Sequence, residues 1–481
     1  MRIRGCLILG CMVAMVEILS AGQNAPSQSP SSQSSGDAST AAAPAGATSA
    51  ISGLLPEGGT GDTNSSLPQI PALLGGMGIS TTVLSEMEKS NYLRGGLNVG
   101  AVYDSNPLLV SSGAESNTSE SVFPNIKIDE TSSRMRWSLA YAGGLTVNQK
   151  FTNQNQGSQN LNFDSQFRLS PHVNLRVAEA FSMSTGFFDA GNGAEAIGGS
   201  GGTNANLITP LATQKSDVTT VETNYHFALN DLIGASGSFS DSHFSNVAAG
   251  GQLANTQTAT ASAFWLHQLF PGDWGGVSYH FQRITYNPSG ETLVHSFLAV
   301  DTVTFSKQYT LTGFIGPQYS ENQGLVPGAL QASNTSNWSV GGGADFGWKN
   351  QSTSVSAGYA RTINNGGGLL GAVLLQTVHG SFRRQFNLKW AAVVNGSYST
   401  NQAQTVPLAT SASSIDLTSA GFSVERNVAK SLGLRMGYTH DFQQQMGVPG
   451  AFSTSPLQTL DASRNRFFFT LSYQWAKPLG M

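Results

Sequence analysis

Apolar side chains recur at every second position over most of the chain beyond residue 91. In the clearest segment, residues 135–147, the odd positions carry Met, Trp, Leu, Tyr, Gly, Leu and Val, and the even positions carry Arg, Ser, Ala, Ala, Gly and Thr. A period of two puts successive side chains on opposite faces of a β-strand, so each run has one apolar face and one small or polar face. About eighteen runs of this kind follow one another. The pattern therefore predicts an all-β protein.

The connections between these runs alternate between short and long. The short ones lie near residues 131–133, 170–172, 230–231, 271–273, 306–308, 349–351, 386–387 and 427–430. The long ones lie near 104–120, 150–158, 185–216, 244–254, 320–335, 363–371, 400–412 and 447–463, and one short connection, 287–290, takes the place of a long one. A soluble sandwich has no reason to alternate in this way, whereas a membrane barrel has tight turns at one rim and longer loops at the other. We expect a transmembrane antiparallel up-and-down β-barrel of 16–18 strands, about 18, over residues 92–475.

Aromatic residues collect near the ends of the runs. Those near the long connections are Tyr103, Tyr286, Tyr319, Tyr359, Tyr398 and Tyr438, and those near the short turns are Trp137, Trp274, Tyr309, Trp348 and Trp390. Transmembrane barrels carry such residues as two girdles at the membrane interfaces. We therefore expect these side chains to mark the two edges of the membrane.

The composition excludes several other classes of protein. Only 11% of the 481 residues are charged, yet outside the N-terminus no apolar stretch is long enough for a transmembrane helix. Gly is abundant, at 55 residues, without the strict period of collagen. The formal net charge of −4 and the lack of a basic stripe argue against a nucleic-acid partner.

The first 21 residues have the layout of a secretory signal peptide. Two arginines lie within the first four residues, residues 5–16 are apolar, and Leu19, Ser20 and Ala21 offer a cleavage site. Export from a Gram-negative cell followed by insertion into its outer membrane is the expectation. Both cysteines, Cys6 and Cys11, lie in this segment, so the mature chain has no thiol chemistry.

Residues 22–91 predict a disordered periplasmic linker ahead of the barrel. From 22 to 50 nearly every residue is Ala, Ser, Gly, Pro, Thr or Gln, a composition with too little apolar surface to fold. Residues 51–91 are mixed, with Leu pairs at 54–55 and 73–74, and residues 80–89 could form one short helix. A mobile linker and a small insert in the lumen both stay open, with the linker favoured. Residues 476–481 form a C-terminal tail.

Two short motifs carry a family resemblance. The first run ends in Tyr103-Asp104-Ser105-Asn106-Pro107, which resembles outer-membrane β-barrel porins, some of them associated with exopolysaccharide systems. The last run places Phe467, Phe469, Leu471, Tyr473 and Trp475 on one face and resembles the C-terminal signature that barrel-assembly machinery reads, although residues 476–481 extend past the final aromatic. The resemblance implies a barrel in outer-membrane lipid and supplies no catalytic residues.

The width of the expected barrel indicates its function. A barrel of 16–18 strands leaves an aqueous channel, whereas an eight-stranded one is filled by side chains. We expect passive diffusion of small hydrophilic solutes through an outer-membrane porin. A conduit or accessory barrel for polysaccharide export and an adhesin remain as alternatives, and the sequence is compatible with a homo-oligomer.

Cationic residues near the short turns fall on the lumen-facing phase. These candidate pore-lining residues are Arg94, Arg134, Arg136, Arg168, Arg176, Lys389 and Arg435. A charge facing lipid at the membrane midplane costs about 2–4 kcal/mol, so the lumen is the favoured location. One interpretation is a positive periplasmic mouth that biases the channel toward anions. The other, equally open, is that these side chains pair with Asp129, Glu130 or Glu425 and brace the wall.

The longest connection, residues 185–216, is a candidate constriction loop. It resembles the third loop of general diffusion porins, which folds inward, and its Gly-rich run at 198–202 would let it bend. Asp189 and Glu195 are its acidic residues. An ordinary surface loop is the alternative.

Enzymatic chemistry has weak support. His243-Phe244-Ser245-Asn246 resembles the His-x-Ser-Asn stretch of outer-membrane phospholipases, with His and Ser on one face, but the flanking residues differ. His440-Asp441 is a still weaker match to outer-membrane proteases. The eight histidines form no metal-binding motif. We therefore expect no enzyme activity, cofactor or metal, and keep a barrel phospholipase as a remote alternative.

Overall fold

A computed structural model of the chain describes the parts that form strands and most turns. The described residues are 91–107, 113–151, 155–186, 212–245, 254–287, 290–306, 308–325, 332–364, 372–403, 414–446 and 461–479. The expected signal peptide, the linker up to residue 90 with its helix at 80–89, and residues 480–481 lie outside them. No helix in the described ranges has the length and apolarity needed to cross a membrane.

Eighteen β-strands make up nearly all of the described chain. They are β1 (Tyr92–Asp104), β2 (Asn117–Thr131), β3 (Met135–Asn148), β4 (Gln156–Arg168), β5 (Val173–Gly186), β6 (Ala212–Ala228), β7 (Asp231–Ser245), β8 (Asn255–Phe270), β9 (Asp273–Asn287), β10 (Glu291–Ser306), β11 (Tyr309–Leu325), β12 (Ala332–Lys349), β13 (Thr353–Asn364), β14 (Val373–Gln385), β15 (Trp390–Ala403), β16 (Ser414–Ala429), β17 (Leu432–Met446) and β18 (Ala462–Pro478). Their lengths, from 12 residues in β13 to 18 in β12, exceed the roughly 9–11 residues that a tilted strand needs to cross a membrane. The last strand runs past Trp475 to Pro478.

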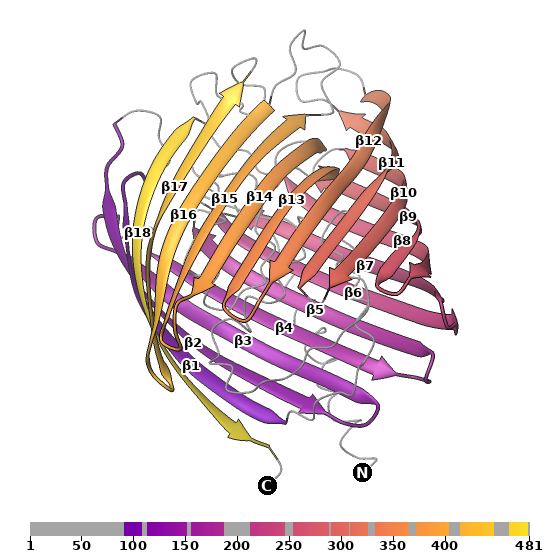
Figure 1. Ribbon diagram of the computed structural model, residues 1–481. Coiled ribbons are helices and arrows are strands. Elements are labelled where there is room, and N and C mark those ends of the chain that lie inside the picture. Colours follow the sequence, from indigo (N-terminus) through magenta and orange to yellow (C-terminus); the bar gives the residue numbers. More distant parts are fainter. Residues whose placement is uncertain are drawn as a thin grey trace, which may run out of the picture. The chain divides into compact units, whose positions relative to one another are not determined.

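The strands close into a ring. Each pairs antiparallel with its neighbours in the sequence, and β1 pairs with both β2 and β18, as Figure 1 shows. Closure leaves no strand edge with unpaired N–H and C=O groups, which lipid could not satisfy. The predicted antiparallel barrel is confirmed, with the strand number at the upper end of the expected range.

The strand register fixes the width of the barrel. Followed once around the ring, the pairing returns to β1 displaced by about 22 residues. With strands roughly 4.8 Å apart, this shear gives a tilt of roughly 40° and a backbone radius of roughly 18 Å. A tilted strand of 15 residues then spans roughly 38 Å along the barrel axis, which exceeds the apolar band of about 25 Å.

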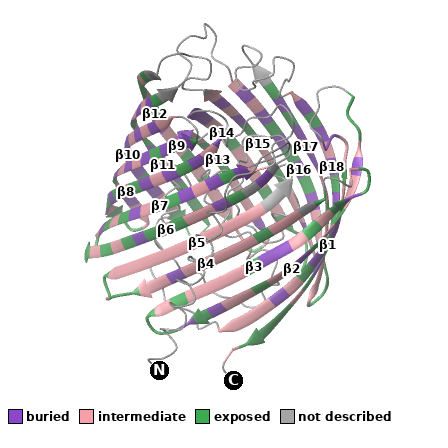
Figure 2. Cartoon of the chain, turned by 180° about the vertical axis from the view of Figure 1, so that it is seen from behind, coloured by how far each residue is buried: buried purple, intermediate pink, exposed green. Residues whose placement is uncertain are grey.

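Successive residues alternate between the two faces of the wall. Phe297 on β10 is 58% exposed, whereas its neighbour Ser296 is fully buried. Away from the turns, the exposed large side chains, such as Leu145, Ile315 and Trp338, fall on one phase, which is the lipid-facing side of the barrel. Figure 2 shows the resulting alternation along β7–β12, while β4 and β5 are mostly intermediate. The other phase, rich in Ser, Thr, Asn and Gln, faces the lumen.

Most of the expected girdle residues lie on the lipid-facing phase. On the turn side, Tyr309 stacks on Trp348 with ring centroids 6.1 Å apart, and on the loop side Tyr319 contacts Trp338 at 5.1 Å. Trp274 and Tyr286 do not belong to the girdles, because both are buried on the inner phase of β9. The prediction was wrong for these two residues, since nearness to a strand end says nothing about phase.

The connections follow the predicted alternation. Turns of a few residues join β2 to β3, β4 to β5 and each later pair up to β16 and β17, and we name this rim the turn side. The opposite rim, the loop side, carries the longer connections and the short one after β9. Gly272 and Gly290 adopt φ values of 91° and 129°, which side chains with a Cβ rarely reach, so glycine is needed in these two tight turns.

Glycines on the inner face make room for neighbouring aromatic rings. A Cβ at Gly343 would lie 2.7 Å from the Phe314 ring and 2.5 Å from the Tyr359 carbonyl oxygen. The rings of Phe264, Phe123 and Phe468 lie in the same way over Gly234, Gly144 and Gly437. Because these rings lie flat along the wall, large side chains fit there without crossing the lumen.

Gly343→Ala should destabilise the barrel by about 1–3 kcal/mol, because its methyl group has no room beside Phe314 and Tyr359. Gly313→Ala on the adjoining strand is the matched control, since its Cβ would meet only the Gly343 carbonyl oxygen at 3.8 Å. The measurement is the urea midpoint of refolding in detergent, read from heat-modifiable gel mobility. Equal midpoints for the two variants would contradict the packing described here.

Candidate channel interior

The turn-side half of the inner wall holds most of the paired charges. At the start of β1, Arg94 Nη1 lies 3.2 Å from Asp129 Oδ2, and Lys127 Nζ lies 2.9 Å from Asp129 Oδ1. The Asp129 side chain is almost fully buried between these two cations. Two positive charges thus meet one negative charge at the β1–β2 pair.

A second cluster joins three strands. Arg176 on β5 donates from Nε to Asp164 on β4 at 2.6 Å and from Nη1 to Glu222 on β6 at 3.2 Å. The guanidinium therefore bridges both of its neighbouring strands, and its planar fork suits two carboxylates at once. Here the acids outnumber the cation.

A third cluster lies on β14, β16 and β17. Arg383 Nη1 lies 2.6 Å from Glu425 Oε2, and Arg435 Nε lies 3.9 Å from Glu425 Oε1. The Arg435 guanidinium also lies over the Phe468 ring, 5.5 Å from its centroid. These contacts hold both cations against the wall.

A further acid on the inner wall faces a histidine across a glycine. Asp345 Oδ1 on β12 and His379 Nε2 on β14 are 3.6 Å apart although β13 lies between their strands. Gly358 on β13 permits this approach, because a Cβ there would overlap Asp345 and lie 2.5 Å from the His379 ring. Every inner acid of the turn-side half described above therefore has a cationic or titratable partner.

Several cations on the same rim have no such partner. Arg136 and Arg168 lie on inner positions near strand ends, and Arg134 and Lys389 lie in the turns themselves. All four are exposed, and the ion pairs of the described residues include none of them. Lys349, which is inner and exposed at the end of β12, likewise has no ion pair among the described residues.

The seven candidate pore residues therefore divide into two groups. Arg94, Arg176 and Arg435 brace the wall, whereas the other four stay unpaired within the described ranges. Glu130 cannot brace the inner wall, because it lies on the outer phase opposite Trp137. That expected pairing was wrong. The acids of the candidate constriction loop, Asp189 and Glu195, lie outside the described residues.

Other charged residues of the inner wall were missed in the sequence. They include Lys127, Asp164, Glu222, Lys349 and Arg383, together with Asp345, Arg464 and Arg466. The alternation itself could have revealed Lys127, because it lies between the outward Ile126 and Ile128. The same alternation points Asp164 and Glu222 inward, beside the outward Phe163 and Val221, but their meeting with Arg176 depends on strand register.

The Tyr103-Asp104-Ser105-Asn106 motif lies where the first and last strands meet. The Ser105 N–H donates to the Asn465 carbonyl at 2.9 Å, and the Asn465 N–H donates to Ser105 Oγ at 2.8 Å. Asn106 Nδ2 donates to the Ser463 carbonyl at 3.1 Å, and the ring of Tyr103 lies 6.4 Å from that of Phe467. The motif thus has a structural role at the β1–β18 seam.

Buried charges surround the same seam on the lumen side. Asp441 Oδ2 accepts a hydrogen bond from Arg466 Nη2 at 2.9 Å, and its Oδ1 accepts one from Ser419 Oγ at 2.7 Å. Arg464 lies 3.6 Å from Asp441 and 3.6 Å from Asp104. The two guanidiniums and Asp441 are at most 3% exposed, so each needs the others to offset the loss of water.

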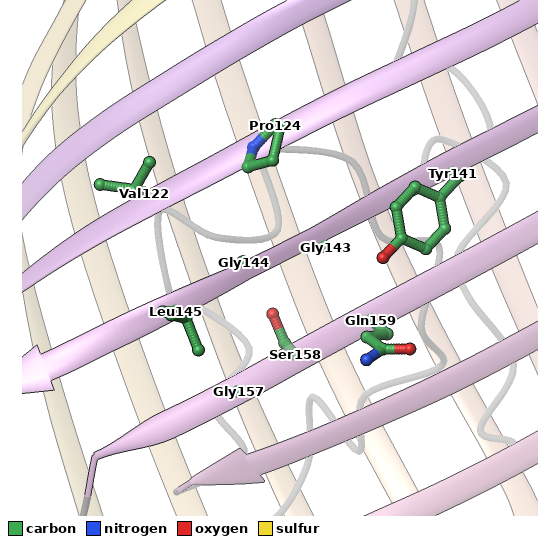
Figure 3. Close-up of a pocket in the computed structure, with 9 residues that line it drawn as sticks. All are labelled: Val122, Pro124, Tyr141, Gly143, Gly144, Leu145, Gly157, Ser158 and Gln159. Atoms are coloured by element: carbon green, nitrogen blue, oxygen red, sulfur yellow. The ribbon is translucent and has the colours of Figure 1, made fainter.

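A shallow cavity of about 400 Å³ opens on the outside of β2–β4. Its outer-phase glycines, Gly143 and Gly157, leave a depression, with Tyr141 and Gln159 at one end and Val122 and Leu145 at the other (Figure 3). Because it lies on the lipid-facing phase, this cavity is not part of the channel interior.

The residues of the enzyme hypotheses lie on β7 and β17. His243 lies on the outer phase of β7, the same phase as the exposed Phe239, and Ser245 ends that strand. His440 shares Asn465 Oδ1 with the Tyr438 hydroxyl, at 2.9 and 2.6 Å, and Asp441 faces the opposite side. Among the described residues, no group of His, Cys, Asp or Glu could hold a metal ion.

Comparison with known proteins gives a distant likeness in chain trace. The chain matches no protein-family model, and no curated protein matches its sequence. Among solved structures it is similar to the unliganded ferric citrate transporter FecA, at 8% identity over 80% of this chain and 79% of that one, with a TM-score of 0.44. It is also similar to Acinetobacter baumannii OccAB3 and to the outer membrane protein opdK from Pseudomonas aeruginosa. Both are 10% identical over 80% of this chain and 99% of theirs, with TM-scores of 0.39 and 0.40.

Asp441→Asn should lower the free energy of unfolding by about 3 kcal/mol, because it leaves two buried guanidiniums without their shared carboxylate. Glu291→Gln is the matched control, since it makes the same chemical change in the exposed Arg283–Glu291 pair and should have little effect. Urea unfolding in detergent, followed by tryptophan fluorescence, measures both. A loss for Asp441→Asn no larger than that of the control would refute the assigned role.

Proposed function

We propose that this chain is an outer-membrane channel for the passive diffusion of small hydrophilic solutes, with a turn-side mouth that favours anions. The observation that carries the anion preference is the imbalance of charge on that rim. Its inner acids are matched by partners, whereas Arg134, Arg136, Arg168 and Lys389 stay uncompensated within the described ranges.

The width of the barrel supports the channel itself. A backbone radius of roughly 18 Å exceeds what wall side chains can fill, and barrels of 16–18 strands generally enclose water. The inner phase is rich in hydroxyl and amide groups, and partly exposed ones such as those of Asn160, Gln166 and Asn174 can replace hydrogen bonds that a hydrated solute gives up. A wide lumen and a polar wall do not select one particular solute.

Solvent limits the strength of the proposed selectivity. At physiological salt a charge is screened over about 8 Å, which is less than half of the roughly 18 Å radius. The rim cations therefore act on anions that pass close to the wall, and the bulk of the lumen feels little field. The preference should be modest at physiological salt and larger at low salt.

Replacing Arg134, Arg136 and Arg168 together with Gln should reduce the anion preference of single channels. The expected change is a shift of the reversal potential toward zero in a salt gradient across a planar bilayer, with stable open steps retained, because the local positive field is lost. The shift should grow as the mean salt concentration falls.

The matched control is Arg384→Gln, which removes a cation at the same rim from the outer phase, where Arg384 Nη1 donates to Thr353 Oγ1 at 2.7 Å. It should leave the reversal potential unchanged. An unaltered reversal potential in the triple variant would reject the anion-favouring mouth. Absence of open steps from folded, unmodified barrels would reject the channel.

A further inference from the structure

One neighbouring pair of strands in the closed ring is joined over only part of its length. β12 pairs with β11 over 17 residues but with β13 over only eight, from Lys349 near the turn side to Gly342. Beyond Gly342, residues 332–341 of β12 continue toward the loop side with no pairing to a described strand on their β13 side. β13 ends three residues beyond Arg361, the register partner of Gly342 (Figure 1). We call the boundary between residues 332–341 of β12 and 362–364 of β13 the β12–β13 seam.

The edge of β12 is accessible at the seam. Ser336, Asn337 and Trp338 are exposed one after another, so the alternation of the wall is lost there. The facing residues of β11 keep the alternation, and Ser320, the register partner of Asn337, is only 1% exposed. Nearness to the loop-side rim therefore does not explain the exposure of β12. It follows from the lack of a paired strand on the other side within the described chain.

The loop-side ends of β13 and β14 lie on the lumen side of the wall. Ile363 and Leu374 are register partners on the phase that faces lipid closer to the turn side, where Val378 is half exposed. Here they are 1% and 5% exposed and share a buried apolar cluster with Val294 of β10. Val294 belongs to the lumen-facing phase, so the end of β13 and β14 packs against the inner face of the wall. β12 and β13 are thus offset across the wall at the seam.

The seam reaches into the membrane. On β12 the girdle residues Trp338 and Trp348 are ten positions apart, which is roughly 25 Å along the barrel axis and matches the apolar band. Gly342 lies four positions from Trp338, so the seam begins roughly 10 Å inside the loop-side edge of that band. Backbone without a paired strand is tolerated at this depth only where protein buries it or water reaches it. The exposed residues at the seam fit the second case, so water of the lumen meets lipid there.

Two buried polar atoms at the seam, Arg361 Nε and Ser339 Oγ, have no hydrogen-bond partner among the described residues. Arg361 lies on the lipid-facing phase between its register partners Gly342 and Gln376, neither of which is an acid. The ion pairs in the part of the chain that the structure describes do not include it. A guanidinium on a lipid-facing phase is costly unless an anion pairs with it. These groups therefore favour an anionic ligand where the seam begins.

We propose that the β12–β13 seam is a lateral port, through which an amphiphile with one apolar chain and an anionic head group passes between the lumen and the loop-side leaflet. Trp338 and Val340, 68% and 54% exposed on the lipid-facing phase of β12, offer apolar surface to the chain. Arg361 and Ser339 offer partners to the head group. A single chain is favoured over two, because each chain exposed to the polar lumen adds to the cost of passage. The port needs an open lumen but not the anion-favouring mouth.

Photolabelling locates the ligand. The probe is a long-chain alkyl sulfonate with a diazirine in its chain, added to folded barrels in phospholipid vesicles, and the adducts are mapped by mass spectrometry. Adducts should concentrate on the seam residues of β12. Arg361→Gln should reduce them about fivefold, and Arg361→Lys should retain most of them, because the charge-assisted contact to the sulfonate is lost in the first variant and kept in the second.

The matched control is Arg283→Gln, which removes another loop-side arginine of the lipid-facing phase, one whose Nη2 lies 2.6 Å from Glu291 Oε2. It should leave labelling of the seam unchanged. Adducts spread evenly over the lipid-facing phase, or equal labelling of the seam in unmodified and Arg361→Gln barrels, would overturn the site. A diazirine-bearing diacyl phosphatidic acid should label the seam less than the sulfonate, and stronger labelling by this lipid would overturn the single-chain ligand.

Passage is measured as transfer of a pyrene-labelled alkyl sulfonate to albumin trapped inside the vesicles, since its permanent charge prevents unaided crossing. Unmodified and Arg283→Gln barrels should transfer it several-fold faster than Arg361→Gln barrels. Equal rates for the three proteins would overturn the port. Faster transfer by unmodified barrels that show no open steps in a planar bilayer would support the port and reject the channel for hydrophilic solutes, so the two proposals fail separately.

Discussion

Backbone hydrogen bonding in a medium without water is the constraint on which this structure depends. Lipid offers no partners to N–H and C=O groups, so the sheet has to close, and β1 has to pair with β18. Closure of 18 strands then determines which strands are neighbours and which face of each strand meets lipid. Neighbours in sequence become neighbours in space, one phase of every strand meets lipid, and most charges of the strands, though not Glu179 in the middle of β5, gather on the inner wall or at the rims.

The strands and their faces could be predicted from the sequence, because alternation is a local property. The number of strands, the turn and loop sides and the inner phase of Arg136 or Arg168 all follow from it. The ends of the strands could not, since pairing continues past the apolar belt where both faces are polar. Trp274 and Tyr286 show a related limit: a position near a strand end was mistaken for a place in the girdle, although phase decides which face a ring occupies.

The contacts inside the barrel depend on register, which no local pattern contains. Arg176 meets Asp164 and Glu222, which lie 12 and 46 positions away in the sequence, only because β4, β5 and β6 are staggered as they are. The same stagger brings Arg94 on β1 beside Asp129 on β2, whereas the outward position of Glu130 follows from the alternation along β2. Candidate pore cations could therefore be named from the sequence, but which of them are neutralised could not. Large apolar side chains on the lumen-facing phase, such as Leu232, Phe264 and Leu298, escaped notice because they break the pattern expected of a channel.

The seam between the first and last strands also bears on how the protein is made. Its contacts, such as those of Asn106 with Ser463 and of Ser105 with Asn465, join residues about 360 positions apart. Such a ring cannot close until β18 has been synthesised, about 360 residues after the end of β1. A nascent chain therefore travels with two unpaired strand edges, and a product truncated before β18 keeps them permanently. The seam makes completeness of translation a condition for a stable protein, so the cell can discard unfinished copies as open, protease-sensitive sheets.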